Sequence, residues 1–188
     1  MKKTLLATVL ASLLLGSTAL SAAVYKVDPS HSTVGFKVKH MMISTVTGKF
    51  GNFSGSYDLD KGQFKSLKGE IKSASIDTGI VKRDDHLRSA DFFDATKFGD
   101  ITFAMTSASK DKMSGNLTIR GITKKVTLDI DMGGTVTDPW GNERSGFVLN
   151  GQINRKDFGL NWNKAIEAGG VVVGDEVKLV IEIEGIEE

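Results

Sequence analysis

Residues 83–98 read RDDHLRSADFFDATKF and form the one long interruption in a chain that otherwise alternates between polar and apolar residues, as β-strands do. Charged residues crowd the first half of the stretch, and Phe92, Phe93 and Phe98 follow within seven residues. The strand pattern resumes at Asp100. This arrangement predicts a short helical flap that is polar outside and whose aromatic end plugs into an apolar interior.

Elsewhere, apolar residues fall on every second position in about eight segments, which is typical of half-buried strands. Val34, Phe36 and Val38 alternate with other residues in this way, and the period recurs over residues 126–132 and 177–183. The joins are short and rich in Gly, Asn and Asp, so neighbouring strands are expected to pair antiparallel. The sequence therefore predicts an all-β fold, a closed eight-stranded antiparallel up-and-down barrel, because closure removes exposed strand edges.

The N-terminal region has the pattern of a targeting segment. A basic pair at residues 2–3 precedes an apolar run over residues 5–16, and small residues follow. This order predicts a secretory signal peptide over residues 1–23 and a periplasmic location. The apolar run is shorter than the about 20 residues that a membrane span needs, so a retained anchor is less favoured. Residues 24–188 are expected to form a single domain.

Composition argues against several classes of function. The chain has 24 Lys and Arg against 23 Asp and Glu, and loss of the two N-terminal lysines with the leader leaves a net charge of −1. A near-neutral surface argues against nucleic acid as a partner, since its capture relies on a dense basic face. There is no cysteine, so stability must come from burial and from closure of the sheet rather than from disulfides.

Three separated motifs resemble those of the YceI-like family: YKVDPSHS at residues 25–32, the flap sequence at 83–98 and NRKDFGL at 154–160. The resemblance covers nearly all of the chain after the leader. It implies a lipocalin-like barrel that carries a long isoprenoid or acyl chain, with no cofactor other than that lipid. In the third motif, Arg155 and Asp157 are candidates for a structural ion pair.

The positions expected to face the interior are rich in Phe and Met, which suits a flexible hydrocarbon tail. Composition alone favours an ordinary filled core, and an eight-stranded barrel can be either filled or hollow. The family resemblance reverses that preference, because it implies a tunnel for a lipid chain. The residues predicted to line the tunnel are Phe36, Val38, Met42, Phe53, Phe92, Phe93, Phe98, Phe103, Met105 and Phe147.

Three polar residues are candidates for contact with a lipid head group: His40, Arg83 and His86. His40 lies on the apolar parity of its strand, where a histidine satisfied within the core is the favoured interpretation. Arg83 and His86 lie in the flap, where they could gate the barrel mouth or simply solvate the helix. The three histidines lack the spacing of a metal site, and no nucleophile motif is present. We therefore predict neither a metal site nor a catalytic residue.

The favoured function is a periplasmic carrier or reservoir for an isoprenoid quinone, a polyprenyl phosphate or a fatty acyl lipid. The resemblance also implies transient contact with a cytochrome b-type membrane protein, and a homodimer. Two alternatives stay open. One is an enzyme that acts on a lipid at the barrel mouth, with His86 and Asp84 as acid and base. The other is a stress-induced interaction protein that holds no lipid.

Overall fold

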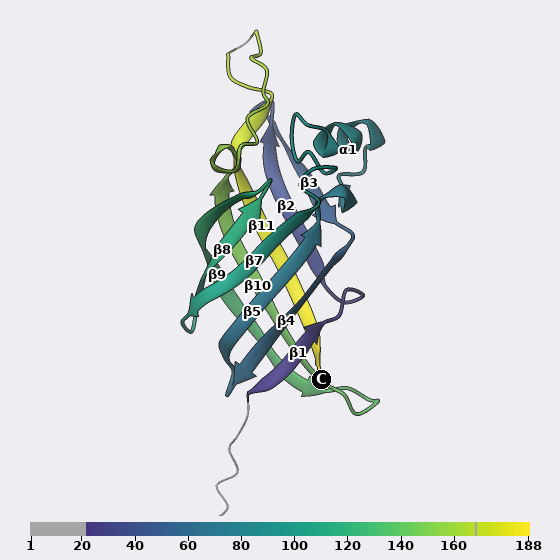
Figure 1. Cartoon of the computed structure of the whole chain (residues 1–188), viewed down its shortest axis with the longest axis vertical. Helices are drawn as coiled ribbons and strands as arrows, with labels where there is room; N and C mark the ends of the chain where they lie inside the picture. The colour runs from purple at the N-terminus through teal and green to yellow at the C-terminus, as the bar shows by residue number, and fades with distance from the viewer. Residues whose placement is uncertain (1–21, 168) are drawn as a thin grey trace, which may run out of the picture.

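The structure is a computed structural model that describes residues 22–167 and 169–188, which form an elongated β-barrel (Figure 1). Most of the predicted signal peptide, residues 1–23, lies outside the described residues, so its removal and the periplasmic location stay predictions. Within the described residues, no helix is long and apolar enough to cross a membrane.

Eight strands within the described part of the chain close into a ring of antiparallel pairs. The ring closes because the first strand pairs with both the fourth and the last. The closed eight-stranded antiparallel barrel predicted from the alternation is thus confirmed. In ring order the strands are β1 (Ala23–Val27), β4 (Phe53–Asp60), β5 (Gln63–Lys72), β7 (Asp100–Ala108), β8 (Lys112–Ile119), β9 (Ile122–Thr137), β10 (Glu143–Asn154) and β11 (Val173–Glu187).

The first strands depart from a simple meander because β11 has 15 residues and β1 only 5. β1 covers only the C-terminal end of β11, and β2 (Thr33–His40) pairs with the rest of it. β3 (Ser44–Phe50) pairs with β2, and the short β6 (Ile76–Asp77) pairs with β3. The β2–β3 hairpin therefore replaces β1 in the wall at one end, which we call the mouth end (Figure 1).

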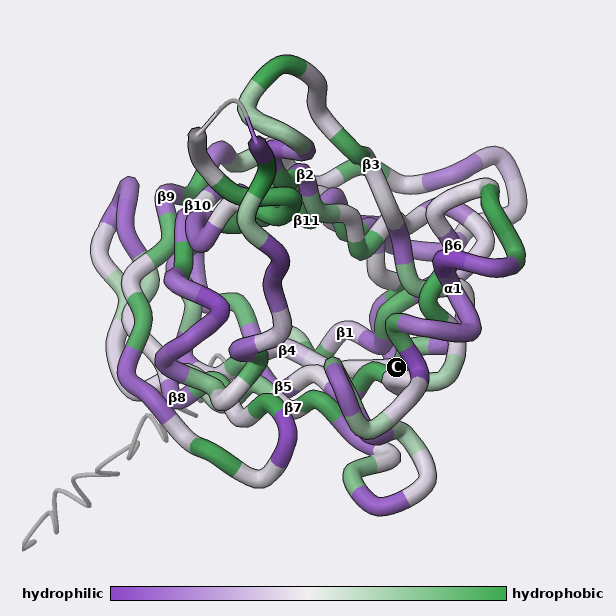
Figure 2. Tube along the Cα trace, turned by 90° about the horizontal axis from the view of Figure 1, so that it is seen from above, coloured by the Kyte–Doolittle hydropathy of each residue, from purple (hydrophilic) through white to green (hydrophobic). Residues whose placement is uncertain are grey.

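The flap lies at the mouth end (Figure 1) and begins with α1 (Val81–Arg88), followed by turns that lead into β7. Seen along the barrel, α1 lies to one side, next to β6 (Figure 2). The buried carboxylate of Asp84 accepts hydrogen bonds from the backbone N–H and the hydroxyl of Thr78. Arg88 donates to the carbonyls of Ala74 and Ile76, 2.8 and 2.9 Å away. Phe92 turns inward and is 6% exposed. The structure confirms a polar helix with an aromatic end that enters the barrel.

An aromatic plug of Tyr25, Tyr57, Phe64 and Phe147 fills the opposite end of the interior. Tyr25 stacks on Tyr57 with ring centroids 5.2 Å apart, and Phe147 meets Tyr57 and Phe64 edge-on at 5.0 and 4.9 Å. Such pairs add to the stabilisation that burial provides. Burial raises the pKa of Tyr57 to about 12, and its hydroxyl donates to the carbonyl of Ser145 over 2.8 Å. The barrel is therefore closed by side chains at this end.

Candidate ligand-binding cavity

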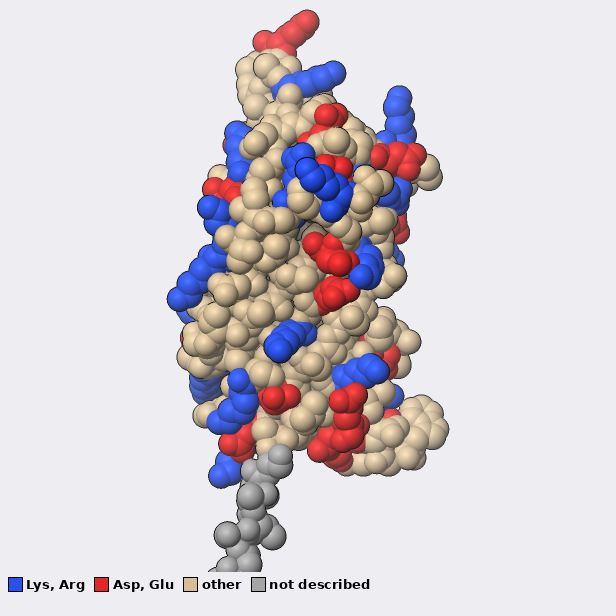
Figure 3. All heavy atoms as spheres, in the orientation of Figure 1, with Lys and Arg blue, Asp and Glu red and all other residues tan. Residues whose placement is uncertain are grey.

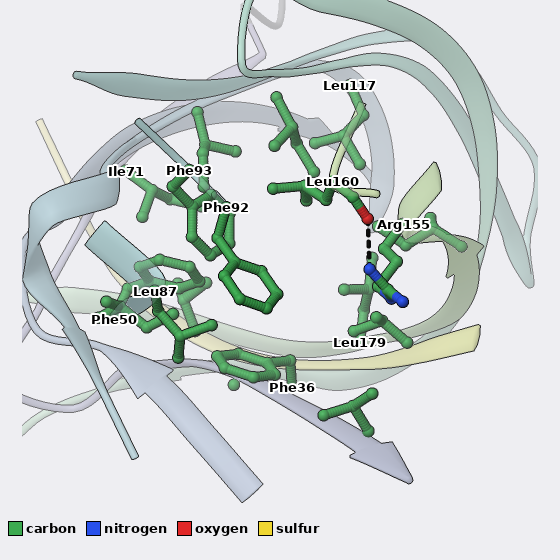
Figure 4. Close-up of a pocket in the computed structure, with 18 of the residues that line it drawn as sticks. Phe36, Phe50, Ile71, Leu87, Phe92, Phe93, Leu117, Arg155, Leu160 and Leu179 are labelled. Carbon is green, nitrogen blue, oxygen red and sulfur yellow. Dashed lines mark hydrogen bonds between the residues drawn. The ribbon is translucent and has the colours of Figure 1, made fainter. Parts of the chain in front are cut away.

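Two adjoining cavities lie inside the barrel between the flap and the aromatic plug. The upper cavity, beneath the flap, has a volume of about 130 Å³, and the lower one, which reaches Tyr57 and Phe147, about 90 Å³. Figure 4 shows side chains from several strands, from α1 and from the flap turns converging on the upper cavity. Five residues line both cavities, so a single layer of side chains separates them: Val34, Ile71, Leu117, Leu179 and Ile181.

Most of the predicted lining residues border one of these cavities. Phe36, Val38, Phe92 and Phe93 line the upper cavity. Phe53, Phe103 and Phe147 line the lower one. Alternation along β2, β7 and β10 placed the inward positions correctly because the period of a strand admits only two faces. Their role in holding a ligand stays a prediction.

Three predicted lining residues border neither cavity. The prediction for Met42 is wrong because β2 ends at His40. Met42 lies in the following turn and is 60% exposed. Phe98 is half-buried outside the barrel, where its ring packs close to Gly121 and Lys97 lies over it at 5.1 Å. Met105 packs against the lower core, next to a register shift that ends the regular alternation of β7.

Several lining residues were not selected from the sequence. Leu117, Leu179 and Ile181 line both cavities, and the alternation over residues 177–183 indicates that Leu179 and Ile181 face inward, but the predicted lining contains mainly aromatic and sulfur-containing side chains. Leu160 is the last residue of the third motif and lies outside any strand, so no periodicity could place it. The channel is therefore more aliphatic than predicted, with walls that suit hydrocarbon rather than water.

Two glycines allow aromatic rings to lie flat against the wall. Gly48 is paired with Phe36, and a Cβ atom on Gly48 would lie 2.3 Å from the ring. A Cβ atom on Gly115 would lie 2.2 Å from the ring of Phe103. Each glycine thus provides the space that its neighbouring phenylalanine occupies. A larger residue at either position would force the neighbouring ring to move.

Arg155 is the one charged residue that lines the upper cavity within the described part of the chain. It is 3% exposed, and burial lowers the pKa of its guanidinium. Its Nε and Nη atoms donate to the carbonyls of Leu160, Trp162, Val173 and Gly174 and to the carboxylate of Asp175.

The predicted pairing of Arg155 with Asp157 is wrong, because the salt-bridge partner of Arg155 is Asp175, with Nη2 3.2 Å from Oδ1, and Asp157 is exposed. Arg155 begins a short 3₁₀ turn, Arg155–Phe158, that directs its side chain back under the segment 160–175. Since its donors all have acceptors in the protein wall, Arg155 fixes this segment and leaves the cavity without a free polar group.

The three predicted head-group residues lie at the mouth end, with His40 at the end of β2 and both Arg83 and His86 on α1. His40 is the last residue of β2, one inward position beyond Val38, and does not line either cavity. Arg83 donates to the hydroxyl and carbonyl of Thr78, so it anchors the flap. Their contact with a head group stays a prediction.

His86 joins the flap to the segment that follows the last 3₁₀ turn. Its Nε2 atom lies 2.8 Å from Oδ2 of Asp91, and its ring meets Trp162 edge-on with centroids 4.8 Å apart. Asp84, by contrast, is bound to Thr78. The acid and base pair considered for an enzyme, His86 with Asp84, therefore has each member engaged with a different partner.

Comparison with known proteins connects this barrel and its cavity to other chains. The YceI-like domain matches residues 25–185. The chain belongs to the YceI-like family. A UPF0312 protein of Staphylococcus aureus strain MSSA476 is 41% identical over 154 residues, which cover 80% of this chain and 90% of that protein. The family resemblance stated from the three motifs is confirmed.

Solved structures share the YceI-like barrel. The YCEI protein of Campylobacter jejuni is 34% identical with a TM-score of 0.69, and the match covers 96% of this chain and 99% of that one. A polyisoprenoid binding domain from Saccharophagus degradans is 16% identical with a TM-score of 0.62, over 87% of this chain and 98% of that one. At that identity the likeness shows the fold alone.

One cluster in this YceI-like barrel resembles a metal site in composition. Asp28, His31 and Glu184 place ligand atoms within 4.8 Å of one another. Arg144, however, already lies among them, with Nη1 3.1 Å from Oδ2 of Asp28 and 2.6 Å from Oε1 of Glu184. A guanidinium that neutralises both carboxylates takes the place of a metal cation. The cluster therefore ties β11, β10 and the turn that follows β1 together as an ion-pair network.

This network predicts a loss of stability in acid. A hydrogen bond with His31, joined by the Ser30 N–H and Arg144, lowers the pKa of Asp28 from 3.8 to about 2 despite partial burial. Because the pKa is lower in the folded state, its contribution to stability is present above about pH 4 and lost as the pH falls toward 2. We expect the melting temperature to fall less steeply over this range in Asp28→Asn. Equal slopes for the two proteins would contradict this role.

Proposed function

We propose that this protein is a periplasmic binding protein that holds the hydrocarbon chain of one isoprenoid or acyl lipid inside the barrel. The observation that carries the proposal is the pair of adjoining apolar cavities, closed below by the aromatic plug and covered above by the flap. Each buried CH₂ group contributes about 0.8 kcal/mol, so a chain of ten or more carbons can bind tightly with few polar contacts.

The walls indicate which part of the lipid is inside. Arg155, the charged group at the upper cavity, already donates to carbonyls and a carboxylate of the protein, so it is not available to a quinone ring or a phosphate. The tail therefore occupies the cavities, and the polar group lies at the mouth end near the flap. The polyisoprenoid binding domain from Saccharophagus degradans has the same fold, so the fold is compatible with an isoprenoid cargo.

The direct experiment is extraction of the purified mature protein into organic solvent, followed by mass spectrometry of the extract. We expect an isoprenoid quinone, a polyprenyl phosphate or a fatty acyl lipid to be recovered in near-stoichiometric amount. Repeated recovery of no lipid would favour the alternative of an interaction protein without cargo. Contact with a cytochrome b-type membrane protein and formation of a homodimer stay predictions that a defined cargo would allow to be tested.

The enzyme alternative has less support than the carrier. The His86 ring packs against Phe92 and Trp162, and its nitrogen is engaged by Asp91. These contacts give His86 a structural role as a latch between the flap and the wall. We expect His86→Ala to accelerate lipid release through a looser flap, and to leave the chemical structure of the recovered lipid unchanged. A recovered lipid that differs chemically between His86→Ala and the wild type would instead favour the enzyme.

The flap offers a matched pair of substitutions that tests the cavity directly. Phe93 lines the upper cavity and meets Phe50 edge-on at 5.9 Å, whereas Phe98 is half-buried outside it. We expect Phe93→Ala to cost less than the about 3 to 5 kcal/mol of a fully buried Phe, because one side of the ring faces open space. Lipid should leave Phe93→Ala faster than the wild type.

Phe98→Ala is the control for this pair. It removes the same ring from the same segment without touching the cavity, so the rate of lipid release should equal that of the wild type. Both quantities can be measured together, by thermal melting and by transfer of lipid to acceptor vesicles. Unaltered release from Phe93→Ala, with a large loss of stability, would show that the flap is ordinary core.

A further inference from the structure

The turn between β2 and β3 lies at the mouth end (Figure 1). Its residues Met41-Met42-Ile43 expose three consecutive apolar side chains, and we call it the mouth turn. The exposed fraction is 39% for Met41, 60% for Met42 and 85% for Ile43. Isolated exposed apolar residues are ordinary, but a contiguous group at the tip of a hairpin indicates a surface that contacts something apolar.

The backbone of the mouth turn adds a second observation. Met41 and Met42 have φ values of +49° and +65°, in the left-handed region where Gly and Asn are favoured. The turn therefore carries large apolar side chains at two positions where its own conformation favours small or polar ones. Such a conflict between local preference and sequence is expected where a side chain serves function rather than folding.

The mouth turn is part of the rim of the upper cavity. The backbone N–H of Met41 donates to the carbonyl of Val172 over 2.8 Å, and the next residue, Val173, is paired with His40. Val173 and Val38 both line the upper cavity. A surface that covers the mouth turn therefore lies against the end from which a bound lipid would leave.

We propose that the mouth turn inserts into the interfacial region of a phospholipid bilayer and holds the mouth end against the membrane. This inference rests on the proposed function, since a lipid cargo is exchanged with a membrane. The turn offers three exposed apolar side chains, far fewer than the about 20 to 30 residues per partner of a stable protein interface.

The charges beside the turn fit an interface with lipid head groups. Two exposed lysines flank the mouth turn, Lys39 and Lys164. Lys39 precedes His40 in the sequence, and the carbonyl of Lys164 accepts a hydrogen bond from the backbone N–H of Val172. Glu167, three residues after Lys164, is also exposed, and Figure 3 shows both positive and negative side chains at the mouth end. Apolar insertion is therefore the main source of binding, and lysine contacts with phosphate are an addition to it.

The test is flotation of the purified protein with vesicles of phosphatidylethanolamine and phosphatidylglycerol, and with vesicles of phosphatidylcholine. The variant is Met42→Asn combined with Ile43→Ser, in which Asn suits the left-handed backbone, so the melting temperature should not fall. We expect its partition to both kinds of vesicle to drop by about tenfold or more, as loss of buried apolar surface predicts.

The matched control is Trp140→Ser. Trp140 is 81% exposed in the β9–β10 hairpin, which lies at the opposite end of β11 from the mouth turn. The Trp140→Ser variant should bind vesicles as strongly as the wild type does. No flotation of the wild type, equal flotation of the mouth-turn variant, or loss in Trp140→Ser alone would each overturn the proposal.

Extraction of lipid from the same preparations separates this inference from the proposed function. Vesicle binding that depends on the mouth turn in a protein from which no lipid is ever recovered would retain the docking surface and remove the carrier. If lipid is recovered from the protein but the mouth-turn variant floats like the wild type, the carrier is retained and the docking surface is removed. The two claims therefore fail by different measurements.

Discussion

Replacing Arg155 with methionine is expected to lower the free energy of unfolding by about 3 to 5 kcal/mol, the range for removing one partner from a buried charged network. The loss follows because the carbonyls of Leu160, Trp162 and Gly174 would be left without the donors that now satisfy them. Denaturant unfolding of the purified variant measures it.

Lys156→Met is the control for Arg155→Met. Lys156 binds the same carboxylate, with Nζ 2.8 Å from Oδ2 of Asp175, but its side chain is 46% exposed. An exposed pair of this kind contributes about 0 to 1 kcal/mol, so this variant should remain close to the wild type. A loss in Arg155→Met no larger than that in Lys156→Met would show that Arg155 is not the anchor of the segment 160–175.

Filling the layer between the two cavities should abolish lipid retention without unfolding the barrel. Leu117 lines both cavities and is 7% exposed. In Leu117→Trp the larger ring can extend into cavities of about 130 and 90 Å³, so the cost of overpacking should stay within about 1 to 3 kcal/mol. We expect recovered lipid to fall by about tenfold or more, because burial of several CH₂ groups is lost.

Asn116→Trp adds the same ring one residue earlier on β8, where the side chain is exposed and faces away from the interior. It should retain lipid as the wild type does and melt at a similar temperature. If Leu117→Trp retained as much lipid as Asn116→Trp, the hydrocarbon chain would have to lie elsewhere than across the layer that Leu117 helps to form.

Much of the barrel could be predicted because a strand offers its side chains only two faces. Once Phe36 and Val38 were assigned inward, the alternation along β2 followed, and the closed ring agreed with it. Alternation predicts the facing of side chains only within a strand. The prediction that Met42 lines the tunnel continues the alternation past His40, where β2 ends, and is therefore wrong. The three-residue turn that follows is set by backbone dihedrals that periodicity does not encode.

The role of Arg155 could not be predicted for a different reason. The nearest carboxylate along the chain, Asp157, was the natural candidate, yet the partner that folding brings close is Asp175, on β11. Contacts between residues distant in sequence depend on how the barrel closes, which local patterns do not determine. The same limit applies to His86 and Trp162, whose rings meet only when the flap covers the mouth end.

The central claim is that the channel holds one hydrocarbon chain, and native mass spectrometry of the protein purified from its own cells tests it most directly. The account predicts a single adduct with the mass of one isoprenoid or acyl lipid on the wild type and on Asn116→Trp, and its absence from Leu117→Trp. A wild-type protein with no adduct, or an adduct of equal abundance on Leu117→Trp, would contradict it.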